Sequence, residues 1–458
     1  MLASAVLGVT LVEDPPIVWL MFGVLSGLAA AYLTSRYPSY ALVILVCLAQ
    51  LYPAVIGQIA LLAPKSSALA VSYWKEIVAL TLGAMVLARG HRDFSVLDWT
   101  VVAFIAVVLF YVFVPAGSIN LYIRMVAARA DAVYLMLFLV ARHLVHHRRT
   151  FQWVEVGLLL LGAIFALGAI LEHFAPAGWA VLINALLGGL SDPSSVRPTT
   201  ELIAGSLFVR AGSFMSNPND LAYFLLIVLG LVIGRIAHRT ASWWIVAIAI
   251  LALAGIAAAL TRSALMTVPV MMGVALLVGR RRGILMTVFI AGLFVALPVA
   301  ASVGLTKRVG LAFQPNDPGT TGHLLHLQQS VALLQTHPMG LGLGTAGEVT
   351  QRFWTSGVQI FYNDSWYFQM STELGILGFL LIIAFLAQLL RELWRRSRGG
   401  SQEALGALCA LSAVAIGGLV LHTFESAQVA WAVMVLAGLA CRSDANAAPQ
   451  FEVTSHHT

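Results

Sequence analysis

Long apolar runs separated by short polar segments dominate the 458-residue chain. Many of these runs approach the 20 or so residues that a helix needs to cross a hydrocarbon core of roughly 30 Å. The clearest are Trp153–Leu171, Ala222–Ile236, Trp243–Leu260, Ser263–Val278, Gly283–Val303 and Leu374–Leu390. The pattern predicts an all-α fold, a polytopic bundle of about 12 or 13 transmembrane helices.

Composition supports a membrane protein. Hydrophobic residues make up 60% of the chain and charged residues only 10%, whereas soluble domains carry about 25% charged residues. The net charge of +6 does not indicate nucleic-acid binding, because the basic residues lie mostly in short segments between apolar runs. In such positions they set the orientation of the helices.

Five basic segments predict that orientation. They are Arg89–Arg92, Arg142–Arg149, Arg235–Arg239, Arg280–Arg282 and Arg391–Arg398. An even number of crossings fits between most successive segments, so the excess of Lys and Arg in cytoplasmic loops assigns all five to the cytoplasm. Room for a site then lies in two larger extracytoplasmic loops.

The chain divides accordingly into six parts. We expect N-terminal transmembrane helices in 1–171, a first extracytoplasmic loop in 172–219, central helices in 220–303, a second loop carrying the candidate active site in 304–373, C-terminal helices in 374–442, and a disordered cytoplasmic tail in 443–458.

Two arginines stand out because they oppose the orientation rule. Arg210 lies in the first loop, and Arg262 opens an otherwise apolar helix at the outer boundary. An arginine near the membrane interior is costly, and its planar fork of donors suits a phosphate group. The alternative for Arg262 is that it only reaches the lipid headgroups or packs at a helix end.

The segment from His337 to Gly347 is rich in glycine. Its G-x-G-x-x-G pattern does not indicate a dinucleotide site, because that fingerprint needs a preceding strand and a cytosolic cofactor. A tight structural turn is the preferred interpretation, with an anion-binding nest of N–H groups as the alternative. His323 and His326 share one face of a helix predicted for His323–Gln335, but metal binding needs a further ligand, and no metal is expected.

Asp364 enters an aromatic stretch, Ser365-Trp366-Tyr367, at the outer membrane edge. Burial there should raise its pKa, unless a cation lies nearby, and a raised pKa makes a competent general base. The alternative is that Asp364 or Asn363 caps the next helix. The earlier segment Asn217-Pro-Asn219-Asp220 is explained by a turn with Asn219 or Asp220 as a helix cap.

Four segments, taken in order, resemble the O-antigen ligase/polymerase superfamily of bacterial envelope glycosyltransferases. They are Arg210-Ala-Gly-Ser-Phe with Asn217-Pro-Asn219, Thr261-Arg262-Ser-Ala-Leu, His337-Pro-Met-Gly-Leu-Gly-Leu-Gly, and Asp364-Ser365 with Glu373-Leu-Gly375-Ile-Leu-Gly378. The resemblance implies a multi-pass protein of the bacterial inner membrane with a periplasmic active site. It also implies an undecaprenyl-diphosphate-linked glycan as donor, and neither metal nor cofactor.

The resemblance also suggests roles for single residues. Arg262 matches the first family arginine, although Met266 stands where the family has leucine. Asp364 holds the place of the catalytic histidine, and His323 that of a second arginine. These two departures favour a polymerase, in which the acceptor is the next lipid-linked repeat unit, over a ligase, in which it is lipid A core.

The mechanism expected from these matches is direct displacement at the anomeric carbon. Arg262 and Arg210, with protonated His323, would stabilise the leaving diphosphate, and Asp364 would take the proton of the acceptor hydroxyl. His337 is a further candidate for substrate binding. Trp366, Tyr367 and Trp354 are candidates for stacking on sugar rings, although aromatic residues at the interface usually act as anchors.

Three other functions stay open at this point. One is the ligase. Another is a transporter or flippase for lipid-linked oligosaccharides, against which the clustering of candidates outside the bundle argues. The third is a non-catalytic assembly factor. For the polymerase, a chain-length regulator and a flippase of the same pathway are the expected partners.

Overall fold

The computed structural model describes the chain from Pro16 to Arg442, apart from several segments. Those segments are 63–73, 89–93, 115–118, 145–147, 187–198, 204–205, 216, 239–241, 280, 303–317, 348–360 and 362–363. The predicted tail, the first basic segment, and the residues Arg308, Arg352 and Trp354 lie outside the described residues.

The described residues are almost entirely helical, as predicted. The helices of the first half are α2 (Pro16–Arg36), α3 (Pro38–Leu62), α5 (Trp74–Ala88), α6 (Val96–Phe113), α7 (Leu121–His143), α8 (Arg148–Phe174) and α9 (Pro176–Leu186). After a hairpin of β1 (Thr199–Ile203) and β2 (Ser206–Arg210) and the short 3₁₀ helix η1 (Ser213–Met215) come α10 (Pro218–His238), α11 (Trp243–Ala258), α12 (Arg262–Val278), α13 (Arg282–Ser302), α15 (Pro318–Thr336), α17 (Trp366–Arg398), α18 (Gln402–Gly417) and α19 (Ala427–Ala440).

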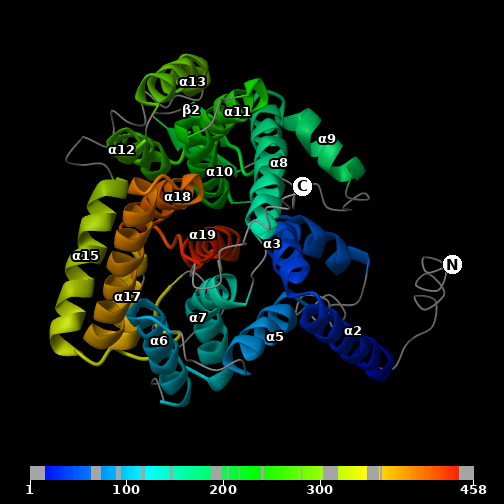
Figure 1. Ribbon diagram of the computed structural model, residues 1–458, viewed down its shortest axis with the longest axis vertical. Helices are drawn as coiled ribbons and strands as arrows, with labels where there is room; N and C mark the ends of the chain where they lie inside the picture. The colour runs from blue at the N-terminus through cyan, green and yellow to red at the C-terminus, as the bar shows by residue number, and fades with distance from the viewer. Residues whose placement is uncertain are drawn as a thin grey trace, which may run out of the picture.

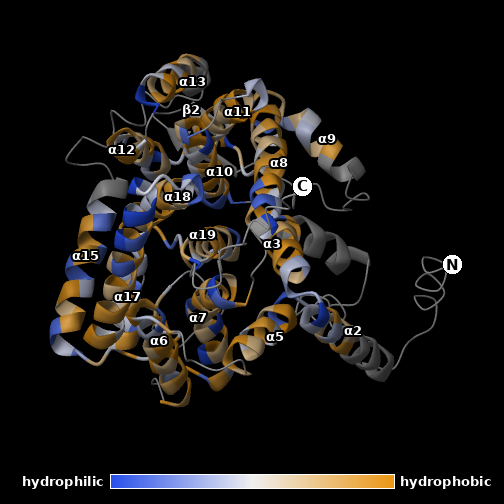
Figure 2. Ribbon diagram, in the orientation of Figure 1, coloured by the Kyte–Doolittle hydropathy of each residue, from blue (hydrophilic) through white to orange (hydrophobic). Residues whose placement is uncertain are grey.

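The runs Trp243–Leu260, Ser263–Val278 and Gly283–Val303 coincide with helices to within two residues at either end, whereas α8, α10 and α17 extend further beyond the runs that predicted them. Within the described residues, four helices are long and apolar enough to cross a membrane, namely α6, α8, α10 and α17. Shorter apolar helices accompany them, including α11, α12, α18 and α19. Figure 2 shows hydrophobic residues along much of the length of the helices. The chain is therefore a polytopic α-helical membrane protein.

The bundle is arranged around α19 and α10. Figure 1 shows α19 in the middle, and it packs against α3, α7, α10 and α18. Helix α10 is also enclosed, because nearly all of its apolar residues are buried. It approaches α18 through glycines: a Cβ on Gly230 would lie 2.8 Å from the backbone N of Ala410, and one on Gly234 would lie 2.6 Å from the carbonyl O of Gln402. Small residues thus allow backbone-to-backbone packing.

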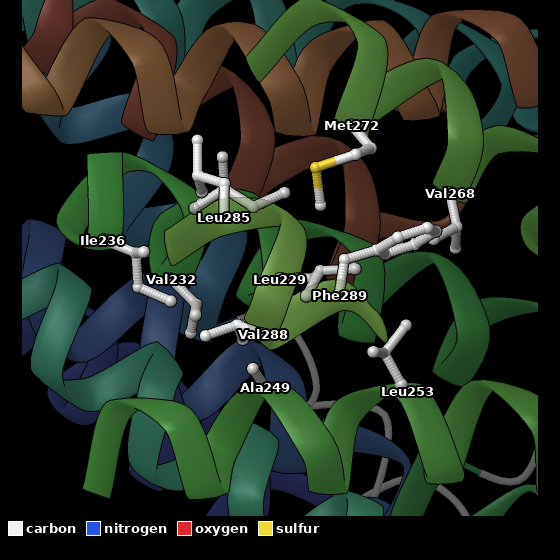
Figure 3. A pocket seen from close by; sticks show the side chains of 11 residues that line it. Leu229, Val232, Ile236, Ala249, Leu253, Val268, Met272, Leu285, Val288 and Phe289 are labelled. Atoms are coloured by element: carbon white, nitrogen blue, oxygen red, sulfur yellow. The ribbon is translucent and has the colours of Figure 1, made fainter. Parts of the chain in front are cut away.

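A small void lies between α10, α11, α12 and α13 (Figure 3). Its volume is about 20 Å³, and apolar side chains such as Leu229, Leu253, Met272 and Phe289 line it. An apolar void of this size stays dry because it offers water no hydrogen-bond partner. It is a packing defect of the core and offers no polar group for chemistry.

Ion pairs join helix ends that carry the basic segments. Arg142 near the end of α7 pairs with Asp98 at the start of α6, with 3.1 Å between Nε and Oδ1. Arg235 near the end of α10 pairs with Glu155 in the first turns of α8, with 2.6 Å between Nε and Oε1. Ends predicted to lie on the same side of the membrane therefore meet in space, which agrees with the alternating helix directions of the predicted topology.

A glycine-rich loop docks on a kink in α17. The helix begins at Trp366, ahead of the predicted Leu374, and Gly375 interrupts it with φ 66° and ψ −164°. At this interruption the N–H of Leu341 donates to the carbonyl of Thr372 (2.7 Å), and the N–H of Ile376 donates to the carbonyl of Pro338 (2.9 Å). The structural interpretation of the glycine pattern is therefore supported.

The group that the N–H donors of this loop bind is the carboxyl group of Glu373, a side chain of the protein itself. The N–H groups of Gly344 and Ala346 donate to Oε1 of Glu373, at 2.9 and 3.2 Å. Glu373 is fully buried, so these donors offset part of its desolvation. The nest therefore has an internal occupant and fastens the loop to α17.

We predict that Gly340→Ala destabilises the protein. Gly340 has φ +78°, and a Cβ there would lie 2.5 Å from the N of Gly375 and 2.6 Å from the O of Glu373. The left-handed backbone alone costs a non-glycine residue about 1–2 kcal/mol, so the melting temperature in detergent should fall clearly.

The matched control is Gly273→Ala. Gly273 lies in α12, and its Cβ would meet nothing within 4 Å. Alanine favours a helix interior over glycine by up to about 1 kcal/mol, so this variant should melt at the same temperature as wild type or slightly higher. Equal melting temperatures for both variants would show that the loop is not held as described.

Candidate active site

Two histidines on α15 converge on Asp364, just before α17. Oδ2 of Asp364 lies 2.8 Å from Nδ1 of His323 and 2.9 Å from Nδ1 of His326. The two histidines are three residues apart on the helix, so one face presents both rings. A carboxylate can only accept hydrogen bonds, which requires each Nδ1 to carry the proton.

These three residues border a cavity of about 170 Å³. Its lining combines a polar patch with an apolar wall: His323, His326, Ser330, Asp364 and Ser365 with Leu324, Leu327, Phe368, Leu419 and Val420. The side chain of His323 is 44% exposed, that of His326 23% and that of Asp364 19%. The cavity therefore presents imidazoles to an incoming molecule while the carboxylate lies behind them.

The pKa of Asp364 is lowered. Burial alone raises it, but the hydrogen bonds and charges of His323 and His326 outweigh burial and bring it from 3.8 down to about 2. The rise in the pKa of Asp364 that burial alone would cause therefore does not occur, because the two histidines oppose it. Asp364 is ionised at neutral pH, and a carboxylate with so low a pKa is a weak general base. Asp364 also does not cap α17, because Ser365 occupies the N-cap position.

A second polar cluster surrounds Arg210 at the end of β2. Its Nη2 donates to Oδ1 of Asn219 at 2.9 Å and lies 3.5 Å from Oγ1 of Thr261, while Nε lies 3.5 Å from the carbonyl of Ala259. Thr261 immediately precedes Arg262, the first residue of α12. The two predicted arginines are therefore brought to one junction of β2, α10 and α12.

One face of α10 connects the two clusters. Asn219 and Tyr223 are four residues apart, so they lie on the same face. The hydroxyl of Tyr223 lies beside Ser263, and its ring packs on Gly417. The next residue, Gly418, accepts hydrogen bonds at its carbonyl from the hydroxyl of Ser365 (3.1 Å) and the N–H of Trp366 (3.0 Å). The residues next to Arg262 and next to Asp364 are therefore linked through the start of α10 and the end of α18.

Three sequence-based candidates do not join these clusters. His337 directly follows α15 and lies about 21 Å along the helix axis from His323, at 1.5 Å per residue. Trp366 is fully buried between Tyr134 and Phe424. Tyr367 is 8% exposed, and its hydroxyl donates to the carbonyl of Ala415. The expectation that these two rings stack on sugars is therefore wrong for this structure, because both belong to the core.

Two site residues were given other roles on sequence grounds. The sequence pattern suggests a role for His326 only as a metal ligand, and for Asn219 only as a helix cap. Helix α10 instead begins at Pro218, and Oδ1 of Asn217 accepts the N–H of Asn219. Across the described part of the chain, no group of three or more His, Cys, Asp or Glu residues is arranged to hold a metal ion.

We predict an acid-dependent loss of stability that runs through Asp364. Because its pKa in the folded protein is about 2 and its ordinary value 3.8, the ionised carboxylate stabilises the fold fully above about pH 4, and this contribution disappears as the pH falls toward 2. The difference in melting temperature between wild type and Asp364→Asn should therefore shrink from pH 6 to pH 3. A constant difference over this range would contradict the assigned ionisation.

Comparison with known proteins found one family match, and it covers most of the residues of the candidate site. Residues 247–383 match the family model described as O-antigen ligase. The match includes Arg262, His323, His326 and Asp364, whereas Arg210 lies outside it. No curated protein matches the chain.

Members of this family are glycosyltransferase-like ligases and polymerases. The match agrees with the motif order found in the sequence and with the helical membrane architecture. It does not distinguish the two acceptors. Residues 247–383 are therefore similar to the O-antigen ligase family, and this match supports the resemblance of the chain to the O-antigen ligase/polymerase superfamily.

Proposed function

We propose that this protein is a metal-independent polymerase of bacterial envelope polysaccharide. It transfers a glycan from an undecaprenyl-diphosphate-linked donor to a second lipid-linked repeat unit. The observation that carries the proposal is the Asp364–His323–His326 cluster, which lies in an open cavity of the region that matches the O-antigen ligase family. We also propose that the protein lies in the inner membrane with this cavity facing the periplasm, and that a chain-length regulator and a flippase are its partners.

The geometry supports a histidine as the base and Asp364 as its positioning partner. Asp364 accepts the Nδ1–H of each imidazole, which makes Nε2 of a neutral ring the nitrogen that can accept a proton. His323 is the more exposed of the two, so we assign the proton transfer to it. This revises the sequence-based assignment of Asp364 as the base, because a carboxylate with a pKa of about 2 has little affinity for the proton.

The transfer is a single displacement. The acceptor hydroxyl oxygen forms a bond to the anomeric carbon while the bond from that carbon to the diphosphate oxygen breaks. The diphosphate leaves with the electron pair, and the hydroxyl proton passes to Nε2 of His323. Arg262 and Arg210 stabilise the charge that develops on the diphosphate, because guanidinium groups bind phosphate oxygens in pairs.

The second candidate is a ligase, which the description of the matching family favours. The chemistry at the donor is the same, and only the acceptor differs. The polymerase rests on the two departures from the family pattern, Asp364 at the place of the histidine and His323 at the place of an arginine. An assay that offers lipid A core and a lipid-linked repeat unit as alternative acceptors therefore distinguishes the ligase from the polymerase.

Complementation of a deletion strain tests the function. Wild type should restore a ladder of long surface polysaccharide on a gel, and Arg262→Ala and Asp364→Asn should leave single repeat units at equal protein level. If the deletion leaves polymer of normal length on its lipid carrier, the protein is a ligase. If both variants behave as wild type, the proposed site is wrong, and a transporter or assembly factor becomes the better explanation.

The choice of base is tested by comparing three histidines in the purified protein. His323→Gln should lower turnover about 10²–10⁴-fold, as expected for loss of a general base. His326→Gln should lower turnover less. His337→Gln is the matched control, because it changes a histidine at the far end of the same helix, and it should leave turnover unchanged. Equal effects of His323→Gln and His337→Gln would refute the assignment.

A further inference from the structure

An apolar groove opens between α2, α3 and α5. Its volume is about 560 Å³, within the range of about 300–1,000 Å³ that is usual for ligand pockets. Helix α2 lies at the edge of the bundle in Figure 1 and packs against α5 and α3. None of the residues that line the groove belongs to the candidate active site, so the groove needs a separate explanation.

One face of α3 lines the groove. Tyr40, Ile44 and Leu48 recur every four residues and therefore share a face of the helix. Each of these side chains is between 44% and 54% exposed. The other side of the helix carries Leu42, which is fully buried in the core. Helix α3 thus packs on the protein with one side and leaves the other side open to a hydrocarbon chain.

The groove is about as deep as one leaflet of a bilayer. It follows α3 from Tyr37 to Leu48, which is about 16.5 Å at a rise of 1.5 Å per residue. Half of a hydrocarbon core of roughly 30 Å is about 15 Å. An acyl chain that enters at Tyr37 would therefore reach the middle of the membrane near Leu48.

Aromatic residues mark the Tyr37 end as the headgroup level. Tyr37 connects α2 to α3 and is 53% exposed. The ring of Tyr40 stacks on that of Trp153 near the start of α8, with 5.0 Å between the centroids and 20° between the planes. Tyrosine and tryptophan favour the boundary between hydrocarbon and headgroups. The groove therefore runs inward from this boundary.

Two exposed arginines flank the same end. Arg36 is the last residue of α2, and Arg149 lies one turn of α8 before Trp153, on the same face. Helices α2 and α3 contain no acidic residue, and Glu155 of α8 is already paired with Arg235. The headgroup end of the groove is therefore positively charged.

This combination of features fits one class of lipid. Basic pockets between membrane helices bind anionic headgroups, above all on the cytoplasmic side, and Arg149 belongs to a basic segment that the sequence predicts to be cytoplasmic. A guanidinium also matches the geometry of a phosphate group. A lipid without net charge would fill the apolar part of the groove equally well, but it would not complement the two arginines.

We propose that this groove binds an anionic phospholipid. One acyl chain lies between α2, α3 and α5, and the phosphate group lies at Arg36 and Arg149. The site is separate from the reaction proposed above, because none of its residues takes part in that reaction.

Native mass spectrometry of the full-length protein tests the headgroup. The protein in detergent is titrated with dioleoyl phosphatidylglycerol or with dioleoyl phosphatidylcholine, which has the same acyl chains and no net charge. Wild type should bind the first molecule of phosphatidylglycerol more tightly than that of phosphatidylcholine. Arg36→Gln and Arg149→Gln should each weaken the first binding step of phosphatidylglycerol about fivefold, the scale of one basic residue near a membrane surface.

Ile44→Trp tests the place of the acyl chain. Ile44 is 51% exposed and lines the groove, so a larger ring there takes up part of its volume and leaves the packed side of α3 unchanged. This variant should weaken the first binding step of phosphatidylglycerol at least as much as either arginine variant does. Its melting temperature should equal that of wild type, which shows that the variant is folded.

Arg395→Gln and Leu109→Trp are the matched controls. Arg395 is an exposed arginine of another basic segment, where it pairs with Glu392. Leu109 is a 53% exposed residue of α6 that does not line the groove. Both variants should bind phosphatidylglycerol as wild type does.

Four results would overturn the proposal. Equal affinity of wild type for both lipids, or wild-type binding by both arginine variants, would refute the anionic headgroup. Wild-type binding by Ile44→Trp would show that the acyl chain lies elsewhere. Equal losses in the two controls would show an unspecific attraction to the whole protein surface. If wild type is a dimer that Ile44→Trp converts to monomers without a change in lipid binding, a second copy covers the groove.

Discussion

The close approach of α10 to α18 is the contact on which the rest of the described structure depends. At Gly230 and Gly234 the α10 backbone lies so close to the α18 backbone that an added Cβ would come within 2.6–2.8 Å of a backbone atom of α18. In a membrane, apolar side chains gain little by leaving lipid, so helices associate through such tight packing and through polar contacts. Because α10 meets α18 without intervening side chains, the ends of both helices are fixed relative to each other.

Both polar clusters build on these ends. The start of α10 carries Asn219 and, one turn on, Tyr223. Gly417 ends α18 and contacts Tyr223, and the next residue, Gly418, accepts a hydrogen bond from Ser365. The two clusters use opposite electrostatics. The amide oxygen of Asn219 accepts a hydrogen bond from Arg210, whereas an ionised carboxylate holds the histidines with Nδ1 protonated. One cluster is suited to binding charge and the other to accepting a proton.

The sequence predicted the helices well and the contacts between them poorly, for physical reasons. The apolar run Ser263–Val278 and the pattern His323–Gln335 are local signals, and helices α12 and α15 match them. The pairing of His326 with Asp364 spans 38 residues, and no local pattern encodes it. Trp366 was misjudged because a membrane helix is apolar on every side, so periodicity does not tell which aromatic ring faces the core. The Asn217-Pro-Asn219 turn was correctly located, but its local pattern favours a cap and says nothing of Arg210.

The position of α19 constrains how the protein is made. Helix α19 is the last of the described helices along the chain, yet it lies at the centre of the bundle (Figure 1) and buries nearly all of its residues. Helices synthesised earlier, such as α3, α7 and α10, line the space that it fills. Contacts between such distant parts of a chain form late, since their loop-closure entropy must be overcome first. The helices that are synthesised before α19 therefore enclose an unfilled space in the bilayer, and the interior of the bundle closes only after α19 has been inserted.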